Sequence, residues 1–205
     1  PGSTQQVELR LGSIFPYNSQ IQISNSEAAI DTLIWQQMAI GLLSGLIFSM
    51  VFYSASIGIN SKDNTYLFLF GSTVFVTLLQ LNDIGALYQL WPDSIYWNNV
   101  SSGIFAVIST LCGVELARSY LITKTNTPRA DKFLKGISLY LLLFAMPLPL
   151  LENDNLFMVF FALPAVIIVL PSLFITSILR IRQKYTPAKL YFIALTMPFI
   201  AGLLI

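Results

Sequence analysis

The chain has 205 residues, of which 55% are hydrophobic and only 10% are charged. Soluble domains carry roughly 25% charged residues, because polar side chains must cover their surface. This composition excludes an ordinary soluble domain and predicts that lipid surrounds most of the chain. The sequence has no histidine and a single cysteine, Cys112, which excludes histidine-based catalytic relays, histidine-ligated metals and an intrachain disulfide. We therefore expect no catalytic residues, no metal and no cofactor here.

Residues 1–24 alternate between apolar and polar positions in the manner of β-strands. Val7, Leu9 and Leu11 share one face, and the alternation returns briefly after Asn18. Two strands alone are marginally stable in water. We therefore interpret this segment as the last strands of an extracytoplasmic β domain that precedes the chain, with a flexible terminus as the alternative.

Long apolar runs follow. Ser24 and Glu27 fit a capping box, which predicts a helix from about Asn25. Because a membrane-spanning helix needs roughly 20 mostly apolar residues, the runs predict six spans, at about residues 33–59, 66–87, 100–122, 136–151, 156–179 and 190–205. The fourth run is short at its outer end. The sixth stops without a flanking anchor, so we expect a seventh span beyond it. The predicted fold is an all-α polytopic membrane helix bundle with a short N-terminal β remnant.

Lysine and arginine are distributed unevenly between the two sides of the predicted bundle. Ten of the 11 lie in or beside the connections that follow the first, third and fifth spans, and only Arg10 lies on the other side. Since basic loops remain in the cytoplasm, these connections are predicted to be cytoplasmic and the N-terminal segment extracytoplasmic. Their placement beside the spans is what topology alone requires, so they do not predict nucleic-acid binding.

Two carboxylates lie inside the predicted spans, where ionisable groups are candidates for function. Asp83 lies near the outer end of the second span. Glu115 lies in the inner half of the third, and Arg118 follows three residues later on the same helical face. Carboxylates at opposite faces do not trace a proton pathway, so we interpret Glu115 and Arg118 as a structural ion pair. Asp83 is expected to be hydrated or to cap an outer turn, and a role in a signalling switch remains open for both carboxylates.

Small residues and prolines mark other parts of the spans. Gly41, Gly45 and Ser49 are four residues apart on one face of the first span, which predicts close packing within the bundle or, alternatively, a dimer interface. Prolines in or beside the last three spans are predicted to kink their helices; they are Pro147, Pro149, Pro164, Pro171 and Pro198.

Several segments together resemble those of a known family over about residues 30–205. Residues 88–93 read Tyr-Gln-Leu-Trp-Pro-Asp, the most specific of these motifs. The others are Gly58–Tyr66, Trp97–Asn99, Ala117–Leu121, Pro128–Leu134 and Tyr185–Tyr191. In order and spacing these segments resemble the bacterial seven-transmembrane receptors with diverse intracellular signalling modules.

This resemblance implies an inner-membrane sensory receptor. It implies a periplasmic jelly-roll sensor domain before the first span, which binds a carbohydrate-like or other small ligand, and residues 5–24 would be its last strands. It also implies a seventh span, a cytoplasmic output module such as a histidine kinase or diguanylate cyclase, and a homodimer. Trp91 and Asp93, in the outer loop, are candidate signalling residues. The alternative is a transporter or channel subunit, which would need a continuous polar route and a discontinuous helix near the midplane.

Overall fold

The computed structural model describes residues 26–61, 63–83, 85–89, 91–151 and 153–203. Within these ranges the chain is helical and contains no strand, so the predicted helical fold class is confirmed. The strands predicted within residues 1–24 fall outside the described residues. The chain divides into two compact units, Pro1–Leu43 and Ser44–Ile205, and the packing described below is that of the second unit.

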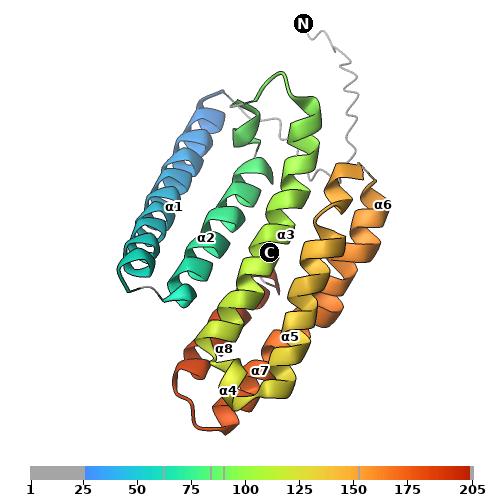
Figure 1. The fold of residues 1–205 in the computed structure, drawn as a ribbon. Helices are drawn as coiled ribbons and strands as arrows, with labels where there is room; N and C mark the ends of the chain where they lie inside the picture. The colour runs from blue at the N-terminus through green and yellow to red at the C-terminus, as the bar shows by residue number, and fades with distance from the viewer. Residues whose placement is uncertain (1–25, 62, 84, 90, 152, 204–205) are drawn as a thin grey trace, which may run out of the picture. The chain divides into compact units, whose positions relative to one another are not determined.

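The helices occupy most of the described chain (Figure 1). Their bounds are α1 Ser26–Ser61, α2 Asn64–Asp83, η1 Ala86–Gln89, α3 Ile95–Tyr120, α4 Thr123–Asn126, α5 Pro128–Tyr140, η2 Leu141–Ala145, η3 Leu148–Leu151, α6 Asp154–Phe157, η4 Met158–Ala162, η5 Ala165–Val169, α7 Leu170–Arg182 and α8 Pro187–Leu203. The segments η1 and η3 are 3₁₀-helices, whereas η2, η4 and η5 are π-helices.

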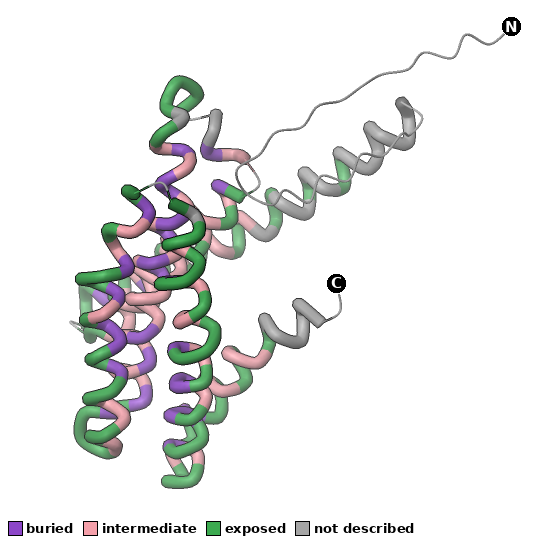
Figure 2. Tube along the Cα trace, turned by 90° about the vertical axis from the view of Figure 1, so that its right-hand side faces the viewer, coloured by how far each residue is buried: buried purple, intermediate pink, exposed green. Residues whose placement is uncertain are grey.

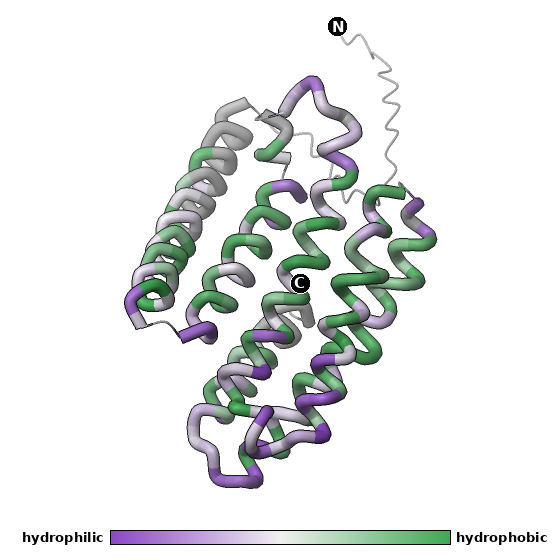
Figure 3. The backbone as a smooth tube through the Cα atoms, in the orientation of Figure 1, coloured by the Kyte–Doolittle hydropathy of each residue, from purple (hydrophilic) through white to green (hydrophobic). Residues whose placement is uncertain are grey.

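Among the described residues, 4 helices are long and apolar enough to cross a membrane: Asn64–Asp83, Tyr96–Tyr120, Pro128–Leu151 and Asn155–Arg182. They correspond to the second to fifth predicted spans. The first and sixth predicted spans fall on α1 and α8, which are helices, and their crossing of the membrane stays a prediction. Apolar residues fill the middle of these helices and polar residues gather at their ends (Figure 3).

Three helices differ in extent from the spans predicted for them. The second span was expected to reach residue 87, but α2 ends at Asp83 and a 3₁₀-helix follows after Gly85. Gly85 has a φ of 82°, a left-handed conformation that glycine adopts readily. The fourth helix begins at Pro128 rather than near residue 136, because proline is favourable in a first helical turn. The helix of the fifth predicted span continues to Arg182, so Arg180 and Arg182 belong to this helix and not to the connection after it.

Helix α3 forms the centre of the second unit. It packs against α2 and α5, and its buried residues include Val100, Phe105, Val107 and Val114. The apolar core continues on the neighbouring segments with Leu134, Ile137, Leu141, Ala145, Phe161, Val169 and Leu173. Figure 2 shows that buried residues line the facing sides of the helices, while exposed residues face outward. Large apolar side chains on that outer surface, such as Phe144 and Ile167, indicate contact with lipid.

Two glycines allow close approach to α3. A Cβ on Gly103 would lie 2.8 Å from the ring of Pro149 in η3, and a Cβ on Gly71 of α2 would lie 3.0 Å from Sγ of Cys112. A larger side chain at Gly103 would force the rigid proline ring away. The small residue therefore sets the separation of α3 and η3.

The π-helices coincide with the prolines. Each π segment ends two residues before a proline: η2 before Pro147, η4 before Pro164 and η5 before Pro171. Proline cannot donate to the carbonyl four residues earlier, and its ring clashes with that carbonyl. In all three cases this carbonyl belongs to the middle residue of the π segment. A wider helical turn is therefore the local response to each proline.

Candidate functional site

A cluster of charged side chains joins α3 to α5. It lies near the end of the helices at which most lysines and arginines are found, which we call the basic end. Arg118 Nη1 donates to Glu115 Oε1 at 2.7 Å and to Oε2 at 2.8 Å. Its Nε donates to Asp131 Oδ1 at 3.1 Å, and Nη2 donates to Oδ2 at 3.4 Å. The predicted ion pair of Glu115 with Arg118 is thus present, and a second carboxylate completes it. Because hydrogen bonds between charged groups are the strong ones, this cluster fixes the relative position of the two helices.

The short connection after α3 brings Asp131 to Arg118. Ile122 has a φ of 48°, which turns the chain sharply, and Thr123 directly behind it is fully buried. The Thr123 hydroxyl donates to Asp131 Oδ1 at 2.7 Å and lies 3.2 Å from the Arg118 carbonyl oxygen. The turn therefore places α5 beside α3 with the aspartate facing inward.

A second arginine, Arg180 in the last turn of α7, is buried without a carboxylate partner among the described residues. Only 4% of its surface is exposed, and its Nε lacks a hydrogen-bond partner there. Its Nη1 donates to Gln183 Oε1 at 2.6 Å, and its guanidinium lies 4.4 Å from the ring centre of Tyr185. A cation over an aromatic face is favourable when water is excluded, so Tyr185 stabilises the buried charge.

The turn between α7 and α8 also contacts the end of α3. The Tyr185 hydroxyl donates to the Tyr120 carbonyl at 3.3 Å, and Gln183 Nε2 donates to the Asn126 carbonyl at 3.5 Å. Beside these contacts lies a groove of about 670 Å³ whose lining includes Asp63, Tyr120, Tyr185 and Tyr191. At the basic end, α2, α3, α8 and the turn before α8 thus surround one partly polar groove.

The other end of α2 and α3 holds an amide network. Asn82 is buried and accepts a hydrogen bond from Ser101 Oγ at 3.2 Å. Asn98 is also buried, and its Nδ2 donates to the Trp91 carbonyl at 3.0 Å. Trp91 is 37% exposed and contacts the Trp97 ring edge-to-face at 6.2 Å. The amide of Asn98 therefore holds the loop between α2 and α3, predicted to be the outer loop, on α3.

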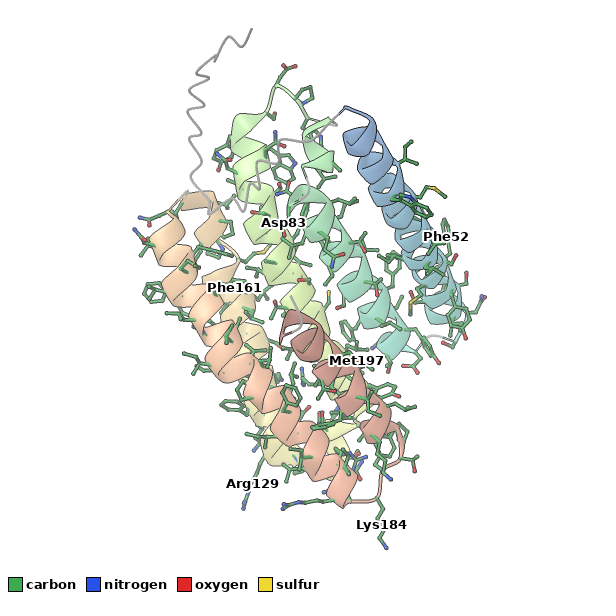
Figure 4. All side chains as sticks on the ribbon, turned by 180° about the vertical axis from the view of Figure 1, so that it is seen from behind. Phe52, Asp83, Arg129, Phe161, Lys184 and Met197 are labelled. Atoms are coloured by element: carbon green, nitrogen blue, oxygen red, sulfur yellow. The ribbon has the colours of Figure 1, made fainter. Side chains whose placement is uncertain are left out.

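The remaining predicted residues do not converge on one site. Asp83 and Asp93 are exposed, and Figure 4 shows Asp83 towards one end of the helices, with Arg129 and Lys184 at the other. Glu115 contacts Arg118, not Asp83. On α1, Gly41 and Gly45 have no atom within 4 Å of a Cβ built on them, and Ser49 donates to the Gly45 carbonyl at 3.0 Å.

Sequence reasoning missed four functional candidates. Asp131 and Arg180 were treated only as parts of charged connections, and Thr123 was not singled out. Asn98 was quoted in a motif without a role. The spacing of Asp131 after a short turn from Arg118 was the one available signal, because antiparallel helices with a tight connection bring such positions together.

Four helices long and apolar enough to cross a membrane place the chain in the class of polytopic helical membrane proteins. Residues 36–205 match the family described as 7TM diverse intracellular signalling. The chain therefore belongs to this family, as the resemblance in its motifs indicated, and is a membrane domain associated with intracellular signalling. No curated protein and no solved structure gives a match.

Proposed function

We propose that this chain is the membrane domain of a bacterial sensory receptor in the inner membrane. In this proposal it relays ligand binding by a periplasmic sensor domain to a cytoplasmic output module such as a histidine kinase or diguanylate cyclase. The observation that carries the proposal is the family match over residues 36–205. The N-terminal segment is then periplasmic, the basic end is cytoplasmic, and a seventh span adds to the six predicted from the sequence.

The contacts at the basic end suggest how the relay works. A ligand shifts an equilibrium between two helix packings only through its different affinity for them. Because Arg118 joins α3 to α5 through Asp131, these helices move together. The Tyr185 contact with the Tyr120 carbonyl passes a displacement of α3 to the turn that precedes α8. In a homodimer, α8 then carries this displacement towards the output module.

At the outer end, the loop held by Asn98 is the proposed contact for the sensor domain. Trp91 and Asp93 are exposed there, so both are accessible to a neighbouring domain. The anchoring of this loop on α3 connects it to the same helix that carries Arg118. A single rigid helix therefore links the proposed input with the proposed output.

A transporter or channel remains the competing proposal. A polar route needs polar groups that are available to the solute. Several hydroxyls within the described spans instead donate to carbonyls of their own helix; examples are Thr73, Thr77, Thr110 and Ser177. These bonds satisfy the hydroxyls inside an apolar environment. They support a packed helical bundle more than a route for polar solutes.

The test is to determine the coding sequence on both sides of this segment. A β-sandwich pattern upstream, with one more span and a kinase or cyclase downstream, supports the receptor. Further spans without a signalling enzyme would refute it and favour the transporter.

A further inference from the structure

Helix α5 presents two different faces. Asp131, Leu134 and Ser138 face inward towards α3 and the core. On the opposite side, Arg129, Lys132, Phe133, Gly136 and Tyr140 share an arc of about 100° at 3.6 residues per turn. The first four of these residues are exposed and Tyr140 is half-buried. This exposed face of α5 therefore begins with two cations and continues with apolar or aromatic positions.

The exposed face of α5 forms one wall of a groove. The groove has a volume of about 430 Å³, and η5 with Pro164 supplies the opposite wall through Pro164, Ile168 and Val169. Gly136 contributes to its width, because no atom lies within 4 Å of a Cβ built there. Apart from Lys132 and the Tyr140 hydroxyl, the lining side chains are apolar.

The groove changes from charged to apolar along α5. Lys132 lies at the basic end and Tyr140 eight residues deeper, which is about 12 Å at 1.5 Å per residue. One leaflet of the hydrocarbon core is about 15 Å thick. The Tyr140 hydroxyl already donates to the Phe160 carbonyl. Pro164 has no N–H group with which to donate to that carbonyl. Because that hydroxyl is engaged, the deep end offers an apolar surface.

Lys132 lines the groove, and Arg129 lies about one turn earlier on the same face of α5, beyond the lining. Both cations are available to an anion. Among the described residues, both recorded ion pairs involve Arg118, and Asp131 is engaged by Arg118 and Thr123 on the inner face. Lys132 and Arg129 therefore have no carboxylate partner in that part of the chain. Basic pockets between membrane helices on the cytoplasmic side are suited to anionic headgroups.

We propose that this groove binds an anionic phospholipid, with one acyl chain between α5 and η5 and the headgroup phosphate at Lys132 and Arg129. The proposal goes beyond the relay and does not depend on it, since it needs only that the helices Pro128–Leu151 and Asn155–Arg182, which contain α5 and η5, cross the bilayer. The length, apolar lining and charged mouth of the groove match those of one chain and its headgroup.

The experiment measures phosphatidylglycerol retention by the purified chain with native mass spectrometry, with phosphatidylcholine as the neutral reference lipid. Lys132→Gln should weaken phosphatidylglycerol binding about fivefold, since one cation near the membrane surface contributes about that factor. Gly136→Leu should fill the groove and also weaken binding about fivefold or more. The control Lys189→Gln removes an exposed cation from α8 and should leave affinity unchanged. Circular dichroism checks that each variant is folded.

Three results would overturn the proposal. Equal retention of the two lipids would mean that the contact is unselective. An equal loss of affinity in Lys189→Gln would assign selectivity to overall charge rather than to the groove. A dimer of the chain that dissociates in Gly136→Leu would make a second copy the occupant.

Discussion

Replacing Arg118 with glutamine should substantially destabilise the helical bundle. The guanidinium makes four hydrogen bonds to two carboxylates, and the side chains of Arg118, Glu115 and Asp131 are only 18%, 22% and 14% exposed. Removing one partner of a buried pair costs about 3–5 kcal/mol. Because this cluster is partly solvated, we expect a loss near the lower limit, about 3 kcal/mol in the free energy of unfolding.

The assay is unfolding of the purified chain in mixed micelles by increasing SDS, followed by circular dichroism. Asp131→Asn keeps the pair of Arg118 with Glu115 and should cost less, about 1–2 kcal/mol. Lys189→Gln is the matched control, since Lys189 is an exposed cation in the first turn of α8 and should change stability by less than about 0.5 kcal/mol. If Arg118→Gln were no more destabilising than this control, the cluster would not hold α3 and α5 together.

Three further predictions concern other parts of the second unit. Gly103→Ala should destabilise the bundle by about 1–3 kcal/mol through overpacking against the η3 proline, whereas Gly136→Ala, which faces open space, should not; SDS unfolding of both variants distinguishes them. Asn98→Ala removes the bond to the Trp91 carbonyl and should loosen the outer loop, seen as faster amide exchange there, with no change at the basic end. Substitution of Trp91 and Asp93 in the full-length receptor should impair signalling at normal expression; unchanged signalling would exclude a role for this loop.

The sequence predicted those features that depend on local pattern. Apolar run lengths located four helices that are long and apolar enough to cross a membrane. The i, i+3 spacing predicted the pair of Glu115 with Arg118. Each of these follows from helix geometry and requires no knowledge of which helices are neighbours.

Tertiary features were beyond that reasoning. Asp131 reaches Arg118 only because Ile122 adopts a left-handed conformation and Thr123 is buried in the turn. Arg180 resembles any cation flanking a span, yet Tyr185 from the following turn covers it. The prolines predicted kinks, but their i−4 carbonyls are accommodated in π turns, a choice that depends on the partners of those carbonyls. These outcomes are set by contacts between segments.

The relay requires the outer loop and the charged cluster to lie on opposite sides of the membrane, and cysteine labelling tests this directly. In a Cys112→Ser background, Ser94→Cys reports on the outer turn and Lys124→Cys on the basic end, since both positions are exposed. A membrane-impermeant maleimide added to spheroplasts should label Ser94→Cys at once and Lys124→Cys only after permeabilisation. Equal labelling of both positions before permeabilisation would contradict a relay across the membrane.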